Sequence, residues 1–159
     1  MGLFGKKKKR KVSIEDTNKV ITKDFSYHPK IILAWAKAIE GNNDLLDYLN
    51  KQNLKELVMA THAIRLKDKA RDWLMKNGYP HVMAMINAAE GNRQAMEWLR
   101  MNDFEVFYNM ARAIDDEPEG FVWLKRNATQ DIFLLTKSIK KVKDEIEEAH
   151  NDIHMRSRD

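Results

Sequence analysis

A repeat of 25 residues runs through most of the chain and constrains its fold more than any other feature. The pair Ala38-Ile39 recurs at this interval as Ala63-Ile64, Ala88-Ala89, Ala113-Ile114 and Ser138-Ile139. A pair of an aromatic residue and Leu follows ten residues later, as Tyr48-Leu49, Trp73-Leu74, Trp98-Leu99 and Trp123-Leu124. An amide side chain stands three residues after each of these Leu residues, as Gln52, Asn77, Asn102 and Asn127. Three columns in one register predict a stack of equivalent structural units.

Each unit has the pattern of two short helices. In the first copy Ile32, Trp35, Ala36 and Ile39 have the spacing that places side chains on one helical face. The second helix of each unit is shorter and is apolar on one side only. We expect the first helices to form a buried layer, and the Met and aromatic columns to belong to the core. Because only about four residues of each unit remain for two turns, the helices should be antiparallel neighbours.

Glycine and proline residues mark the expected helix ends. Gly41 and Gly91 follow the first helix of copies one and three, where a helix favours a residue that tolerates positive φ. Pro80 and Pro118 stand where helices are expected to begin, and the first turn is the part of a helix that tolerates Pro. Asp103 is expected to cap the N-terminus of the helix that follows it.

The fifth copy departs from this pattern. It begins at about Thr129 and has no aromatic residue at Glu148, where the period requires one. Its apolar residues instead alternate in steps of three and four, which is the spacing of a heptad seam. The seam comprises Ile132, Leu135, Ile139, Val142, Ile146, Ala149 and Ile153. We therefore expect one long helix over 129–159 that caps the stack, with self-association or binding of a partner helix as the alternative role of the seam.

Stacked helical hairpins in one register resemble an α-solenoid, the architecture of tetratricopeptide and HEAT-type proteins. The resemblance covers about residues 28–140 and is one of architecture, since a 25-residue unit is shorter than the repeats of either family. The expected fold is all-α, an α-α superhelix of four hairpins over 28–128 followed by the capping helix. The resemblance implies a scaffold that presents an extended surface to a partner, and it assigns no binding residue.

Composition narrows the class of protein further. A chain of 159 residues forms one domain of ordinary size, and its lack of cysteine excludes disulfides, a cysteine nucleophile and thiolate metal sites. No apolar stretch approaches the ~20 residues that cross a bilayer. We expect a soluble, cytoplasmic protein, or a nuclear one if its source is eukaryotic.

The positive charge of the chain lies in one segment at its start. Residues 1–12, MGLFGKKKKRKV, hold six of the 28 basic residues and no acid, so 22 basic and 24 acidic residues remain for the rest. The basic residues are Lys6, Lys7, Lys8, Lys9, Arg10 and Lys11. This segment is similar to a monopartite nuclear localisation signal. It also suits adhesion to an anionic membrane or to nucleic acid, and it equally suits a disordered, solvated tail.

A short helix and linker are expected over 13–27, because Ser13 to Asp16 resemble a capping box. The residues from Phe25 to His28 are expected to serve as the linker to the first repeat.

Side chains that carry catalysis or bind metals are sparse. His150 and His154 share a helical face with Glu147 one turn before them, which makes a weak candidate metal site on a solvated helix. Asp115, Asp116, Glu117 and Glu119 form an acidic cluster at a turn, where solvated carboxylates are equally expected. His62 and His81 are expected to be structural. No nucleotide-binding, hydrolase or calcium-loop motif is present, and we expect no catalytic residue and no cofactor.

A polar column on the first helices is the candidate binding surface. Its members are Lys37, His62, Asn87, Arg112 and Lys137. If the first helices line the inner side of the solenoid, this column faces a concave groove suited to an acidic or polar segment; otherwise it is a solvated helix face.

The expected function is a non-enzymatic scaffold for an unidentified protein or peptide. The alternatives are binding of nucleic acid or an anionic surface through the tail and, third, a metal-dependent or carboxylate enzyme. We expect a monomer, with a dimer through the C-terminal helix as the alternative.

Overall fold

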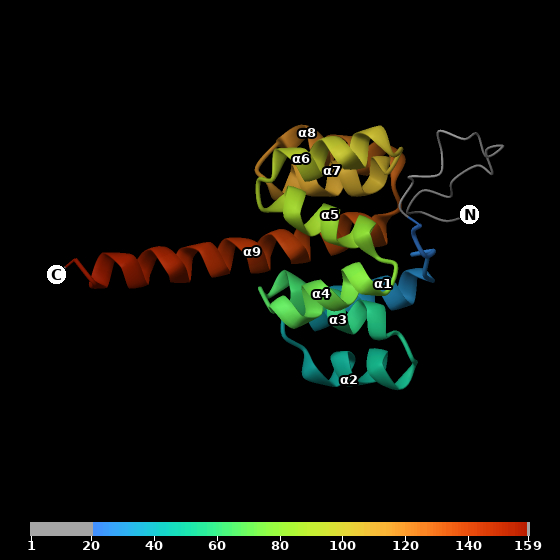
Figure 1. The fold of residues 1–159 in the computed structure, drawn as a ribbon, viewed down its shortest axis with the longest axis horizontal. Helices are drawn as coiled ribbons and strands as arrows, with labels where there is room; N and C mark the ends of the chain where they lie inside the picture. The colour runs from blue at the N-terminus through green and yellow to red at the C-terminus, as the bar shows by residue number, and fades with distance from the viewer. Residues whose placement is uncertain (1–20, 159) are drawn as a thin grey trace.

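A computed structural model describes residues 21–158, and in this range the chain forms nine α-helices and no strand (Figure 1). The expected basic tail at 1–12 and the capping box at Ser13 lie outside the described residues. The helices are α1 (Pro29–Ile39), α2 (Asn43–Lys51), α3 (Lys55–Ile64), α4 (Asp68–Lys76), α5 (Pro80–Ala89), α6 (Arg93–Met101), α7 (Glu105–Ile114), α8 (Pro118–Asn127) and α9 (Gln130–Arg156).

The helices pack as the repeat predicts. Within each unit the first helix packs against the second, as α1 with α2, α3 with α4, α5 with α6 and α7 with α8. Pro80 and Pro118 each occupy the first turn of a helix, as expected. The fold is therefore all-α and solenoid-like, with one hairpin per 25-residue unit.

The turn inside each hairpin contains one residue with positive φ, and this residue also recurs every 25 positions. Gly41 and Gly91 have φ values of 111° and 96°, which confirms their expected role at the ends of α1 and α5. Leu66 and Asp116 hold the same place after α3 and α7, with φ values of 67° and 65°. A left-handed residue ends these helices because its backbone turns the chain while the last carbonyl groups still accept hydrogen bonds.

The expected capping role of Asp103 is wrong. Asp103 has a φ of 62° and lies in the left-handed turn after α6, while Phe104 is the residue that precedes α7. Asp and Asn are the side chains best tolerated in this conformation after Gly, so Asp103 ends one helix instead of beginning the next.

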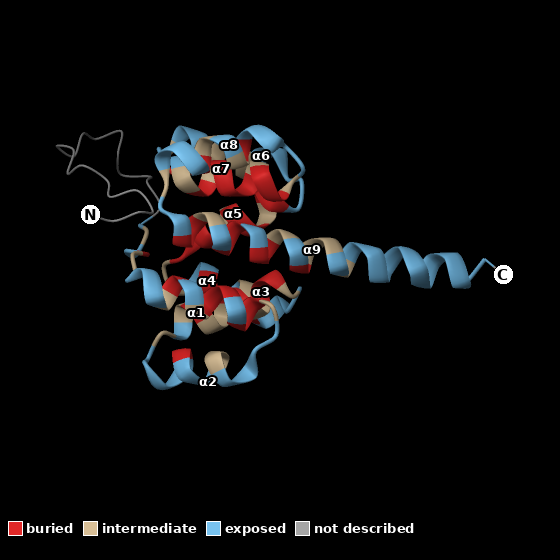
Figure 2. Ribbon diagram, turned by 180° about the vertical axis from the view of Figure 1, so that it is seen from behind, coloured by how far each residue is buried: buried red, intermediate tan, exposed pale blue. Residues whose placement is uncertain are grey.

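The odd-numbered helices form the interior and the even-numbered helices cover it (Figure 2). The Leu column of the even helices is fully buried, whereas Trp98 is half-buried and Tyr48 is 42% exposed. Trp73, Trp98 and Trp123 are half-buried and pack against the core, so the prediction that the aromatic column belongs to the core is confirmed only in part. Met101 is 70% exposed and lies outside the core. An outer helix has one face on the core, and Leu occupies it.

Helix α9 closes the stack into a ring. It packs against α7 and α8, as a cap should, and also against α1 at the other end of the repeat (Figure 1). Because α1 contacts α3, α3 contacts α5 and α5 contacts α7, the five odd-numbered helices form a closed cycle of contacts. Within the α9 seam the residues from Ile132 to Val142 are buried, and Ile153 is exposed.

Phe25 belongs to the core, although residues 25–28 were expected to be a linker. Its side chain is 1% exposed, and its ring centroid lies 5.6 Å from that of Trp35 and 5.9 Å from that of Phe107. Next to it the hydroxyl of Tyr27 donates a hydrogen bond of 2.7 Å to Glu56, and burial together with this bond raises the pKa of Tyr27. The segment before α1 thus completes the interior of the ring.

Candidate functional site

One residue of the repeat leaves a space in the core. Position 39 of the first copy is Ile, and its equivalents at 64, 114 and 139 are Ile as well, each buried. The third copy has Ala89 at this place, also buried. An Ala in a column of Ile side chains lacks three carbon atoms, so the layer that these residues form is incompletely filled.

A pocket of about 150 Å³ lies beside Ala89. It is found where α3, α5 and α7 end against the middle of α9. Its apolar lining consists of Ile64, Leu66, Ile86, Ala89, Ile114, Ile139 and Ile146. We name it the isoleucine pocket.

Leu66 stands out at the edge of the isoleucine pocket. It has a φ of 67°, which is unfavourable for a bulky side chain, and it occupies the position that Gly holds in copies one and three. Its side chain is 51% exposed. The sequence analysis missed both Leu66 and Ala89, although each is visible there as the exception in its column.

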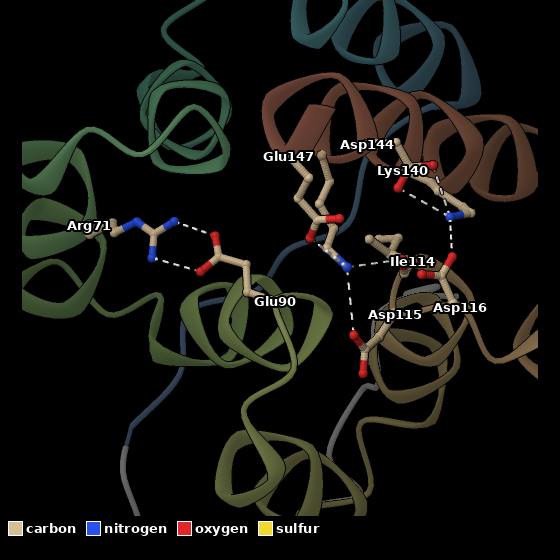
Figure 3. A network of polar contacts seen from close by, with 9 residues as sticks. Arg71, Glu90, Ile114, Asp115, Asp116, Lys140, Asp144 and Glu147 are labelled. Carbon is tan, nitrogen blue, oxygen red and sulfur yellow. Dashed lines mark hydrogen bonds and ion pairs between the residues drawn. The ribbon is translucent and has the colours of Figure 1, made fainter. Parts of the chain in front are cut away.

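Three charged residues, Glu90, Lys143 and Glu147, line the pocket beside its apolar residues, and Figure 3 shows the polar contacts that these residues make. The ammonium group of Lys143 lies 3.4 Å from the carbonyl oxygen of Ile114 at the end of α7. The same group lies 3.6 Å from Asp115 and 3.5 Å from Glu147. Across the pocket Arg71 pairs with Glu90, which follows α5. The charged groups at the rim of the pocket therefore form ion pairs with one another, and the residues below them are apolar.

A second ion pair joins α9 to the turn after α7. Lys140 contacts Asp116 at 2.5 Å and Asp144 at 2.9 Å. Partial burial alone would lower the pKa of Lys140, but the hydrogen bonds to Asp116 and Asp144 raise it overall. The hydrogen bond from Lys140 correspondingly lowers the pKa of Asp116. Asp115 and Asp116 of the predicted acidic cluster thus hold α9 against the end of α7, whereas Glu117 pairs with Arg112 of α7 itself.

Helix α9 continues past the pocket into solvent (Figure 2). Every described residue from Glu147 onward is exposed, and Ile153 has 66% of its surface accessible. The nine residues from Glu148 to Arg156 extend the helix by about 13 Å beyond the pocket. The isoleucine pocket and this free helix form one continuous candidate surface.

No residue of the polar column lines the isoleucine pocket. The inner side of the odd-numbered helices is packed core, because α9 closes the ring. Lys37 and Lys137 are exposed, whereas His62, Asn87 and Arg112 are half-buried. Arg112 donates to Glu117 at 2.8 Å, and this bond raises the pKa of Arg112. Binding of a partner by the column remains a prediction.

The other candidate residues lie apart from the pocket. The rings of His150 and His154 are 5.3 Å apart on the exposed end of α9, while Glu147 is directed to Lys143. In residues 21–158 no group of three potential metal ligands is present. His81 is buried among the rings of Phe104 and other core residues, and His62 is half-buried on α3.

A second hollow, of about 450 Å³, lies between the start of α6 and the end of α7. Its lining includes Arg93, Glu97, Asp115 and Glu117, so it is a charged surface depression. Specific binding sites are mostly apolar with a few polar groups placed around them. The isoleucine pocket has that composition, and it is the stronger candidate.

Ala89→Ile tests the origin of the pocket. The substitution restores the residue of the other four copies, and we expect it to raise the free energy of unfolding by about 1–2 kcal/mol by filling empty space. Urea denaturation of both proteins measures this. A decrease in the free energy of unfolding by more than about 1 kcal/mol, the usual cost of overpacking, would show that there is no room for a larger side chain at Ala89.

No family model matches the chain, and neither the curated proteins nor the solved structures contain a match to it. None of the helices within residues 21–158 combines the length and apolar character needed to cross a membrane.

Proposed function

We propose that the protein is a non-enzymatic interaction module that holds a bulky apolar side chain of a protein or peptide partner in the isoleucine pocket. The observation that carries this proposal is the gap at Ala89 in an otherwise regular column of Ile, which opens at the surface beside an uncovered helix.

The size of the pocket supports a side chain as its ligand. Sites for whole cofactors and drug-sized molecules enclose about 300–1,000 Å³. A cavity of about 150 Å³ lined by Leu, Ile and Phe accommodates one benzene-sized group. The isoleucine pocket, also about 150 Å³, therefore suits a single Phe, Leu or Ile that anchors a larger partner.

The conformation of Leu66 supports a role beyond stability. A residue in an unfavourable backbone conformation costs roughly 1–3 kcal/mol, and such strain is concentrated at functional sites. Gly would remove this cost at position 66, as it does at positions 41 and 91. Leu66 instead places a half-exposed apolar side chain against the opening of the pocket.

Selection of displayed peptides tests the proposal. A phage library of random 16-residue peptides is selected on the full chain, and the selected peptides are measured against Ala89→Ile and Leu66→Gly. We expect at least tenfold weaker binding to both variants, because one fills the pocket and the other removes its wall. Leu66→Gly relieves backbone strain, so loss of binding by a folded variant separates recognition from stability.

The polar column provides the matched control. Circular dichroism first confirms that the double variant Lys37→Glu, Arg112→Glu is folded. Peptides that bind this variant as tightly as the unaltered protein support the isoleucine pocket as the binding site. Selected peptides that bind Ala89→Ile as tightly as the unaltered protein, and that do not bind the double variant, would show that the polar column is the binding surface. Absence of any peptide sensitive to Ala89→Ile would overturn the proposal.

A further inference from the structure

The fifth unit of the ring lacks an outer helix. Each of α2, α4, α6 and α8 packs against the inner helix of its own unit and against the inner helix of the next unit. At this second contact Phe121 of α8 meets Phe133 of α9, with ring centroids 5.5 Å apart. Because α9 continues as one helix, no outer helix within residues 21–158 packs against both α9 and α1. Leu134 of α9 and Leu33 of α1, the equivalent of Phe133, are each 40% exposed at this open place.

The outward face of α9 carries a charge pattern that is complementary to itself. The residues of this face are all exposed, and they are Leu134, Lys137, Lys141, Glu148, Asp152 and Met155. They follow one another in steps of three, four, seven, four and three positions, so they lie along one side of the helix. The steps are the same from either end, and the charge changes sign at the middle.

Two copies of this face therefore fit together in antiparallel orientation. Pairing about the middle brings Lys137 of one copy opposite Asp152 of the other. It brings Lys141 opposite Glu148 in the same way, and Leu134 opposite Met155. Because the arrangement has two-fold symmetry, each of these contacts occurs twice.

Within one chain the charges of this face have few counter-charges. No ion pair among residues 21–158 includes Lys137, Glu148 or Asp152. Lys141 lies 3.6 Å from Glu40, and its side chain is 60% exposed. The two Lys residues are one helical turn apart, as are the two acidic residues, and like charges at this spacing destabilise a helix. A second copy supplies the opposite charge to both pairs.

The two acidic residues at the middle of the face each have a Lys one turn before them. Asp144 pairs with Lys140 of the same helix at 2.9 Å. Glu145 follows Lys141 by four residues, and antiparallel pairing also brings it near Lys141 of the other copy. Both carboxylates thus have a positive charge nearby at the centre of the pairing.

The two halves of α9 have the lengths that this arrangement requires. The ion pairs between α9 and the rest of the ring end at Lys143. From Gln130 to Lys143 the helix is about 21 Å long, and from Asp144 to Arg156, where it projects from the body (Figure 2), about 20 Å. Pairing about the middle places the free half of each helix along the ring-bound half of the other, with the two rings at opposite ends. An outer helix of a hairpin is likewise antiparallel to its inner helix, so the free half fits the open place.

We propose that the protein forms a two-fold dimer in which residues 144–156 of each copy take the place of the missing outer helix of the other. The contact uses a different face from the apolar seam of α9, which is buried in the ring from Ile132 to Val142. The isoleucine pocket lies on another side of α9, at Ile139, Lys143 and Ile146, so the dimer does not rest on the proposed function. Such a dimer presents two pockets, and a partner with two matching side chains gains avidity from both.

Sedimentation equilibrium over a range of protein concentrations tests for the dimer. We expect the mass of the full chain to rise with concentration from 18.7 kDa to about 37 kDa, twice the mass of one copy. The mass of one copy at all concentrations up to about 0.5 mM would overturn the proposal and leave the open place to a helix of a different protein.

Charge reversal tests which face forms the contact. The double variants Lys137→Glu, Lys141→Glu and Glu148→Lys, Asp152→Lys each bring like charges together, and we expect each to dimerise at least tenfold more weakly. Circular dichroism confirms that both are folded. Mixed in equal amounts, the two variants have complementary faces and should form a heterodimer about as tightly as the unaltered protein dimerises. Dimerisation that neither double variant weakens would contradict the assigned face.

A matched variant controls for the change in net charge. Lys67→Glu, Lys69→Glu alters the charge by the same amount at exposed positions around the start of α4, which does not pack against α9. We expect this variant to dimerise like the unaltered protein. Weakening equal to that of Lys137→Glu, Lys141→Glu would show that net charge is responsible, and would overturn the assignment.

Disulfide formation tests the orientation of the two helices. The chain has no cysteine, so Leu134→Cys with Met155→Cys introduces two thiols about 31 Å apart along one helix, too far to pair within a chain. In the antiparallel dimer each thiol faces the other one in the second copy, and oxidation should link most of the chains in pairs. The two single variants are the controls and should remain largely unlinked. Linkage of either single variant as complete as that of the double variant would indicate parallel helices and overturn the proposed arrangement.

Discussion

Replacing Phe25 by Ala is expected to lower the free energy of unfolding by about 3–5 kcal/mol. The side chain is 1% exposed, and it contacts aromatic rings of α1, of α7 and of the turn before α5, including Trp35, Phe107 and Tyr79. Truncation therefore leaves a cavity where three parts of the ring meet. Chemical denaturation followed by circular dichroism at 222 nm measures the loss.

Ile21→Ala is the control for Phe25→Ala, because Ile21 belongs to the same segment and is 87% exposed. We expect it to change the unfolding free energy by less than about 0.5 kcal/mol. A similarly small effect of Phe25→Ala would show that residues 21–28 are dispensable and that the ring is stable without them.

Gly120→Ala is expected to destabilise the protein by about 3 kcal/mol, although Ala is the better helix former. A Cβ atom at this position would lie 2.5 Å from the amide nitrogen of Ala113 and 2.5 Å from the carbonyl oxygen of Asn109. Both atoms belong to the backbone of α7, which no rotamer change can move. Helix α8 would have to shift away from α7, with loss of packing around Leu124.

The third repeat supplies the comparison for Gly120→Ala. Ala95 is the equivalent residue 25 positions earlier, so α6 already accommodates a methyl group there. Ala95→Gly should cost only about 1 kcal/mol, the usual difference in helix propensity. Thermal unfolding of the two variants side by side distinguishes the effects, and an increase in stability of Gly120→Ala would show that α7 and α8 are not in close backbone contact.

Helix positions and hairpin pairing could be predicted from the sequence because both depend on local signals. The 25-residue period determined which helices are equivalent, and Gly41, Gly91, Pro80 and Pro118 marked their ends. The error at Asp103 has a local cause as well, since the same side chain suits both an N-cap and a left-handed turn.

Ring closure and the role of Phe25 could not be predicted in this way. A repeat pattern specifies how each unit packs on the next, and it contains no information on whether the first and last units meet. Phe25 precedes the first repeat and has no equivalent in other copies. Its burial depends on a contact with residues such as Phe107, far away in the sequence.

Two residues of the candidate site could have been recognised in the sequence, because each differs from the equivalent residues of the other repeats. The columns identified the core because their members are alike, whereas the site is built from two residues that differ from their column. Ala89 is too small for its layer, and Leu66 is too large for its turn. Listing the exceptions to a repeat, once its period is known, would have found both.

The contact between α1 and α9 changes how the protein is expected to fold and unfold. In an open array each unit contacts only its neighbours, so unfolding can start at either end and proceed unit by unit. A ring has no terminal unit, and α1 cannot detach without also breaking its contact with α9. The same contact joins residues about a hundred positions apart, which slows folding because a long loop must close first. Closure therefore replaces gradual fraying of a linear array with one slower, cooperative transition.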